Sequence, residues 1–126
     1  MKSWDVQDPT DTAAGLGVFH TSETNAIFGP TNTENSPNNP PIPPSYSTSL
    51  NAPIIPVIQG YWTSFIRIFN PNVFRKVGTV VWSDFGVNGE MRRLRFVTNA
   101  TEVENVPLDQ RMRCAALRAN GVRWQQ

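Results

Sequence analysis

The stretch that decides the fold reads GLGVFHTSE, residues 15–23, and is closed by AIFG at residues 26–29. It contains His20, the one histidine of the sequence, and Glu23, a carboxylate three residues later. Two glycines before the histidine permit the tight backbone that a projecting side chain needs. Imidazole titrates near neutral pH, so it suits general acid–base catalysis. His20 is therefore the candidate catalytic residue.

The composition limits what this chain can do. It has 126 residues, a formal net charge of +1 and 11 prolines, and 39% of its residues are hydrophobic. A charge so close to zero indicates neither nucleic acid nor an anionic membrane as a partner. The hydrophobic residues suffice for one helix and a few strands with an apolar face, and we expect them to be too few for a core that this chain encloses by itself. We expect the chain to cover part of a larger sheet.

Several sequence signals are absent or weak. Met1 is not followed by the apolar core of a signal peptide, and no apolar run approaches the length of a transmembrane helix. One histidine and one cysteine, far apart, make no metal-ligand cluster, and no cofactor is indicated. Cys114 has no second cysteine to pair with, so we expect a small buried side chain on a helix. Asn99-Ala100-Thr101 is a glycosylation sequon, which matters only in a secreted protein.

Local patterns predict a small set of elements. Apolar residues recur at nearly 3.6-residue spacing between Ala52 and Phe69, which predicts a helix with Asn51 as its N-cap. Alternating cationic and apolar residues at 92–98 predict a strand with one wet and one dry face. The Pro/Asn/Ser-rich residues 31–51 are expected to be irregular. The remaining expected elements are strands at 4–7 and 79–82, a turn at 84–90, and a helix at 107–118 that ends before Gly121.

Taken in order, these segments resemble the C-terminal part of type-B carboxylesterases and lipases, within the α/β-hydrolase superfamily. Within this family, the sequence motifs most resemble those of fungal extracellular lipase-like carboxylesterases. The matching motifs are the histidine loop, Phe28-Gly29-Pro30, Ile58–Arg67 with the stop Asn70-Pro71-Asn72, Trp82, Arg93–Phe96 and Gln110–Cys114.

The resemblance carries a set of expectations. It implies an α/β fold present as an incomplete C-terminal fragment, with residues 1–126 forming a partial type-B carboxylesterase domain. It implies that His20 is the triad base and that Glu23 is a buried carboxylate near the active site, not the triad acid. The intact parent would be a secreted protein acting on a carboxylic ester or lipid. A cysteine before the histidine loop, outside this chain, would pair with Cys114.

The sequence also departs from the family pattern. In this family the histidine is the last triad member along the chain, and here it comes almost at the start. No Gly-x-Ser-x-Gly elbow or glycine-rich oxyanion loop occurs, and none of Asp5, Asp8 and Asp11 is well placed as the triad acid. Thr21 stands where many relatives have glycine, and Ala115 follows Cys114 where relatives continue toward an aromatic pair.

Two functions remain open from the sequence. The first is a fragment of an ester hydrolase that carries the triad histidine, lacks the serine, and is inactive alone. Its missing N-terminal hydrolase portion, or a partner chain, would supply the serine, the acid and the oxyanion hole. The alternative is a non-catalytic binding or assembly module that keeps the hydrolase elements as a scaffold. Its apolar helix face at Ile58, Trp62, Phe65 and Phe69 would then cover a partner subunit.

Overall fold

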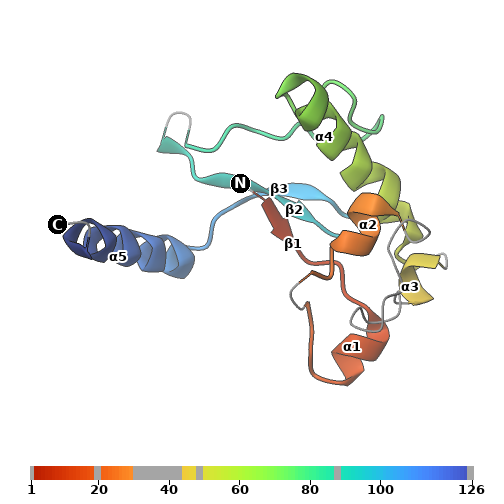
Figure 1. Cartoon of the computed structure of the whole chain (residues 1–126), viewed down its shortest axis with the longest axis horizontal. Helices are drawn as coiled ribbons and strands as arrows, with labels where there is room; N and C mark the ends of the chain where they lie inside the picture. The colour runs from red at the N-terminus through yellow and green to blue at the C-terminus, as the bar shows by residue number, and fades with distance from the viewer. Residues whose placement is uncertain (1, 19–20, 30–43, 48–49, 87–88, 125–126) are drawn as a thin grey trace.

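A computed structural model describes residues 2–18, 21–29, 44–47, 50–86 and 89–124 (Figure 1). Three strands form one sheet, and the helices are distributed around it. The elements in chain order are β1 (Lys2–Trp4), α1 (Pro9–Ala13), α2 (Thr24–Phe28), α3 (Pro44–Ser47), the 3-10 turn η1 (Ala52–Ile54), α4 (Ile55–Ile68), β2 (Arg92–Phe96), β3 (Glu102–Asn105) and α5 (Leu108–Trp124).

The sheet is mixed, with the strand order β1-β2-β3. β1 and β2 run parallel, with Trp4 aligned with Phe96, whereas β2 and β3 are antiparallel, with Leu94 opposite Val103. Parallel strands need a long crossover between them, and here that crossover contains α4. This arrangement confirms the predicted α/β class.

The two faces of the sheet have opposite chemistry. Leu94 and Phe96 are completely buried on the face that α4 covers. Arg93 and Arg95 point to the other face, where Arg93 Nε lies 2.6 Å from Glu104 Oε1 and Arg95 also pairs with Asp5. The predicted wet and dry faces of this strand are confirmed.

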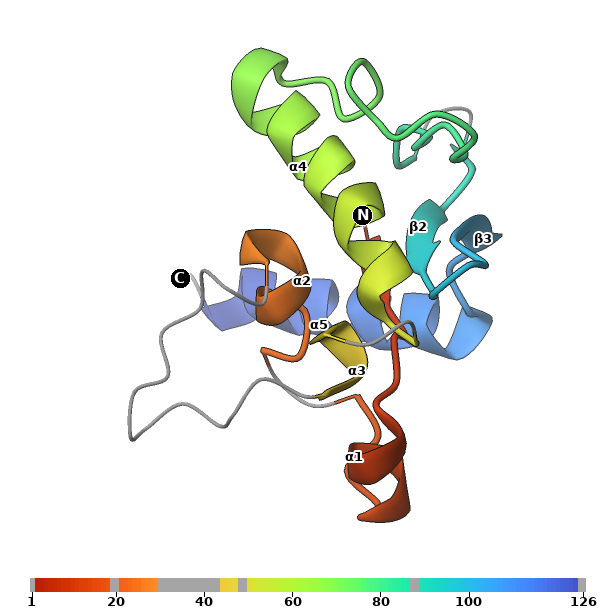
Figure 2. The ribbon, with the colours of Figure 1, turned by 90° about the vertical axis from the view of Figure 1, so that its right-hand side faces the viewer.

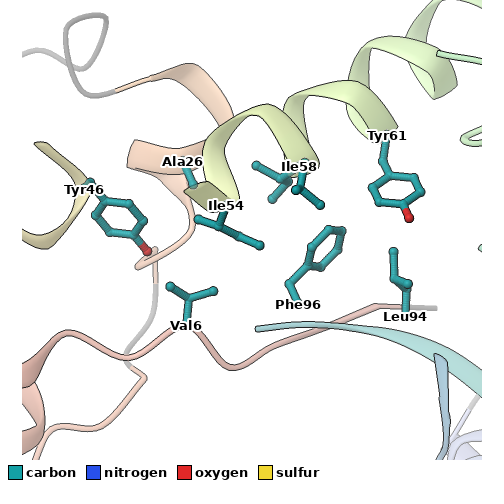
Figure 3. Close-up of a cluster of buried hydrophobic side chains, with 9 residues drawn as sticks. Val6, Ala26, Tyr46, Ile54, Ile58, Tyr61, Leu94 and Phe96 are labelled. Carbon is teal, nitrogen blue, oxygen red and sulfur yellow. The ribbon is translucent and has the colours of Figure 1, made fainter. Parts of the chain in front are cut away.

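The predicted long helix is present as η1 followed by α4. It ends where Phe69 adopts a left-handed conformation with φ 57°. Ile54, Ile58 and Tyr61 on its first turns are buried in the core, as Figure 3 shows. The apolar pattern continues toward Phe69, but the last turns carry it into solvent. Only the first half of the predicted face is therefore covered.

The core joins α4, α2 and α3 to the sheet (Figure 2 and Figure 3). Tyr61 lies at one end of this core in Figure 3, with its ring edge-on to Phe96 at 5.8 Å and to Trp82 at 5.7 Å between centroids. Each large apolar side chain buried in this way contributes about 1.5–3 kcal/mol. The buried members are Val6, Ala26, Tyr46, Ile54, Val57, Ile58, Tyr61, Leu94 and Phe96.

The predicted strand at 79–82 is wrong. Trp82 N donates to Asn72 Oδ1 at 2.7 Å, and Asn72 Nδ2 donates to Trp82 O at 3.1 Å. The Asn72 side chain thus pairs with both backbone groups of Trp82, which a neighbouring strand would otherwise have paired. Tyr61 Oη donates to Val80 O at 2.5 Å and holds the segment beside α4.

Of two expectations about the ends of helices, one is confirmed in position and the other is wrong. Asn51 is the N-cap residue of η1, as predicted, but its side chain makes no capping hydrogen bond. Its side chain instead donates to Gln7 O at 2.9 Å and accepts from Thr98 Oγ1 at 2.7 Å, so it joins three distant segments. Gly121 lies inside α5 and not beyond its end.

The remaining differences concern single elements. β1 covers residues 2–4, earlier than the predicted 4–7, and β3 was not predicted. Cys114 is exposed, not buried, because the middle of α5 is exposed on every side and the helix extends away from the sheet (Figure 1). Much of the Pro/Asn-rich segment lies outside the described residues, although α3 forms near its end. No helix in the described part of the chain is both long and apolar enough to cross a bilayer.

Candidate functional site

The candidate base, His20, lies outside the described residues together with Phe19. The segments on both sides of it are described, and they define where the histidine loop leaves and rejoins the fold. The site is therefore built from these two flanks.

The flank before the histidine is fixed by Asp8. Its Oδ1 accepts the backbone N–H of Thr10 at 2.8 Å and caps α1, and Thr12 Oγ1 donates to its backbone oxygen at 2.8 Å. Burial acts to raise the pKa of Asp8, but hydrogen bonds from Ser45 and from the backbone outweigh it and lower the pKa. Asp8 is thus a charged anchor of this turn at neutral pH.

Two glycines then carry the chain toward the histidine. Gly15 has φ 76° and Gly17 has φ 57°, which is the left-handed region that favours glycine. A Cβ at either position would meet nothing within 4 Å. The requirement for glycine therefore comes from the backbone conformation, as the sequence predicted, and not from lack of space.

The flank after the histidine begins with a strained residue. Thr21 has φ 71°, which a β-branched side chain rarely adopts. This is the position where relatives of the resembled family often have glycine, so the departure noted in the sequence falls on a left-handed residue. The substitution leaves backbone strain one residue after His20.

Helix α2 attaches this flank to α4. Ala26 is completely buried, and Gln59 Nε2 of α4 donates to Ile27 O at 3.2 Å. The buried Tyr46 of α3 donates its hydroxyl to Ser22 O at 3.0 Å. The backbone just after His20 is thus held from two sides (Figure 2).

Tyr46 is a part of this site that the sequence analysis missed. Burial, with smaller contributions from the charges of Asp8, Glu23 and Asp11, raises the pKa of Tyr46 to about 12. Its phenol is therefore neutral at physiological pH and acts as a hydrogen-bond donor. The one available signal was an aromatic residue in an otherwise polar and proline-rich segment.

Glu23 stands at the start of α2 and pairs with β1. Its Oε1 lies 3.2 Å from Lys2 Nζ, and the Lys2 ammonium lies 5.2 Å from the centroid of the Trp62 ring. The pair is half-buried. The structure thus brings Glu23 together with the sheet and α4, and its place beside a triad stays a prediction.

Asn99 lies in a turn after β2. It is exposed and left-handed, with φ 61°. Its side chain is therefore accessible to a modifying enzyme, and its glycosylation stays a prediction.

A groove opens beside the last turns of α4. It encloses about 550 Å³ and is lined mainly by aromatic and aliphatic side chains. Trp62 and Trp82 are stacked in it, with centroids 5.9 Å apart and rings inclined by 15°. The lining residues are Lys2, Trp62, Phe65, Ile66, Phe69, Pro71, Trp82, Ser83, Asp84 and Phe85. Tyr61 is a core residue, whereas Trp62 is only half-buried and lines the groove.

The fold can be compared with known proteins. A parallel pair of strands and its helical crossover match a fragment of an α/β-hydrolase fold of the carboxylesterase/lipase kind. The crystal structure of Aspergillus niger EstA, such a hydrolase, matches with a TM-score of 0.79 and 36% sequence identity. The match covers 96% of this chain and 22% of EstA, so the chain spans about a fifth of that protein.

The resemblance recognised in the sequence is confirmed at this level. No family model matches the sequence, and no curated protein matches it.

Proposed function

We propose that the chain is a C-terminal portion of a carboxylic-ester hydrolase of type B and that it contributes the triad base, His20. The observation that carries the proposal is the 36% identity to EstA over 96% of the chain, which includes the glycine-framed loop. The anchored flanks on both sides of residues 19–20 support it, because a base must be held in a fixed place to act.

In this proposal the rest of the hydrolase supplies the serine, the acid and the oxyanion hole. His20 takes the proton of the serine hydroxyl as the oxygen attacks the ester carbonyl. The ester C–O bond then breaks, and the imidazolium returns the proton to the leaving alkoxide. A water molecule, activated by the same imidazole, attacks the acyl-enzyme and releases the carboxylic acid.

The substrate class follows from the same proposal. It is a carboxylic ester or a lipid, and no nucleic acid is involved. An extracellular location of the intact parent fits the accessible sequon at Asn99.

The isolated chain is expected to be inactive, because without a serine nucleophile the imidazole has no hydroxyl to activate. The test is hydrolysis of p-nitrophenyl butyrate by the purified chain and by His20→Ala. The proposal expects both rates to equal the rate without protein. Turnover by the unsubstituted chain that His20→Ala abolishes would overturn the expected inactivity.

The second candidate function is a non-catalytic binding or assembly module. The observation that favours it is the uncovered apolar face of the last turns of α4, where Phe69 is 83% exposed. Thermal unfolding and sedimentation separate the two candidates. A monodisperse chain that unfolds cooperatively favours the module, and aggregation of the chain alone favours the hydrolase portion.

A further inference from the structure

We infer that Tyr46 is a positioning residue for the triad base. By holding the backbone of Ser22, the second residue after His20, it fixes the end of the histidine loop for proton transfer. The inference rests on the proposed function and adds to it a residue that decides where the base stands. Tyr46 acts through the backbone and transfers no proton itself.

The contact that carries the inference is buried and joins distant parts of the chain. Tyr46 is 3% exposed, and its hydroxyl donates to the Ser22 carbonyl oxygen at 3.0 Å. Ser22 is itself buried. A buried carbonyl that loses its donor is left without a replacement from water, so this hydrogen bond resists opening. In Figure 3 the Tyr46 ring extends from α3 toward the core, whose packing keeps the ring in place.

Asn51 attaches α3 to the other flank of the histidine loop. Its backbone N–H donates to Ser45 O at 2.8 Å, and its side-chain Nδ2 donates to Gln7 O at 2.9 Å. Gln7 lies just before α1, on the flank that leads to the loop. The segment that carries Tyr46 is therefore joined to the chain before the loop as well as after it. This gives Tyr46 a fixed support from which to hold Ser22.

The residue between the base and the Tyr46 contact is the strained one. Thr21 has φ 71°, and a residue in such a conformation persists only where its surroundings hold it. The described contacts that do so are the bond from Thr24 N to Thr21 O at 3.0 Å and the bond from Tyr46 to Ser22. Loss of the Tyr46 hydroxyl would therefore let the backbone next to His20 relax.

Tyr46 can make this contact wherever an imidazole works as a base. Burial raises the pKa of Tyr46 to about 12, so the phenol keeps its proton at neutral and mildly alkaline pH. An imidazole titrates near neutral pH, far below that value. The contribution of Tyr46 is therefore the hydrogen bond to Ser22.

Tyr61 provides a matched control. It is completely buried, and its hydroxyl donates to a backbone carbonyl, that of Val80, at 2.5 Å. Replacing either tyrosine with phenylalanine removes one hydroxyl and leaves one backbone carbonyl without its donor. The two variants are therefore expected to lose similar stability. Only Tyr46 bonds the flank of the histidine loop, so only Tyr46→Phe should affect the base.

The test uses a single-chain chimera in which this chain replaces the matched portion of EstA. We expect Tyr46→Phe to lower kcat for p-nitrophenyl butyrate about tenfold or more and to leave KM within about twofold, because a displaced base weakens the transition state and not substrate binding. Tyr61→Phe should leave kcat within about twofold for a similar fall in melting temperature. Equal kcat values for the two variants would overturn the inference.

A second measurement uses the full chain by itself and does not depend on the chimera. Amide hydrogen exchange at residues 21–24 is expected to be faster in Tyr46→Phe and unchanged in Tyr61→Phe. His20 is the one histidine of the sequence, so its imidazole NMR signals need no further assignment. These signals should shift in Tyr46→Phe alone. Unchanged exchange and unchanged imidazole signals in Tyr46→Phe would overturn the inference.

The chimera also separates this inference from the proposed function. A chimera whose rate survives His20→Gln would contradict the proposed function, whatever Tyr46→Phe does. A chimera that loses its activity with His20→Gln but keeps it with Tyr46→Phe would contradict the positioning role alone.

Discussion

Lys2 on β1 and Glu23 at the start of α2 form an ion pair, with 3.2 Å between Nζ and Oε1. The side chains are 28% and 30% exposed, so solvent screens the pair only in part. Because Glu23 follows His20 by three residues, the pair fixes the end of the histidine loop to the sheet. Lys2 also lines the groove beside the last turns of α4.

Replacing Lys2 with Met removes the charge and keeps an apolar stem against Trp62. We expect the free energy of unfolding to fall by up to about 1 kcal/mol at low salt, which is the range of partly exposed pairs. The difference should shrink in 1 M NaCl, where the pair is screened. Urea unfolding at both salt concentrations measures it, with Glu23→Gln closing a double-mutant cycle. Equal stability of Lys2→Met and the original chain at low salt would contradict the role of the pair.

Thr21→Gly should stabilise the chain. The left-handed conformation of Thr21 costs about 1–2 kcal/mol. Glycine removes this cost, but the greater freedom that it gives the unfolded chain lowers the free energy of unfolding by about 0.4–1 kcal/mol. The expected net gain is about 0.5–1 kcal/mol in thermal or urea unfolding. Ala14→Gly is the control, because Ala14 has φ −79° and should lose stability. A loss with Thr21→Gly would show that no strain is stored there.

Gly60→Ala and Gly121→Ala should act in opposite directions, although both glycines lie in helices. A Cβ on Gly60 would lie 2.9 Å from Lys76 N and 3.1 Å from Phe74 O, both backbone atoms. We expect a loss of about 1–3 kcal/mol there, as for overpacking of a core. Gly121 has open space around it, so alanine should gain about 0.5–1 kcal/mol of helix propensity. A harmless Gly60→Ala would mean that the segment after α4 does not pack against it.

The stability of the chain should fall in acid partly through Asp5. A hydrogen bond from Arg95 lowers the pKa of Asp5 below its ordinary 3.8, against the opposing effect of burial. As the pH falls below about 4, the unfolded chain binds this proton before the folded chain does, so the contribution to stability is lost through the folded pKa. Asp5→Asn should therefore be less stable than the original chain at pH 6, with the gap closing toward pH 3. A gap independent of pH, or one that persists in Arg95→Met, would contradict this account.

The sequence predicted those helices and strands whose pattern of apolar residues lies within a single segment. The apolar period of α4 and the alternation of β2 each lie within one segment, and both elements formed where expected. Asn51 is at the predicted N-cap position, but its side chain does not cap the helix because it bonds Gln7 and Thr98, which are distant in sequence. The strand predicted around Trp82 was wrong because the Asn72 side chain forms hydrogen bonds with both backbone groups of Trp82.

The candidate site was predictable to a similar extent. The glycines before His20 could be assigned a conformational role, because glycine adopts a positive φ without the steric cost that other residues have. The partner of Glu23 could not be predicted, because Lys2 reaches it only through the pairing of β1 in the sheet. Tyr46 was missed for the same reason, since its contact with Ser22 links segments 24 residues apart.

The central claim is that this chain supplies the base of an ester hydrolase. The measurement that tests it most directly uses a single-chain chimera in which this chain replaces the matched portion of EstA. Hydrolysis of p-nitrophenyl butyrate by this chimera is compared with hydrolysis by the chimera carrying His20→Gln. The account predicts turnover by the first chimera and a loss of about 10³-fold or more in the second, with unchanged melting temperature. A His20→Gln chimera that folds and keeps its rate within about tenfold would contradict it.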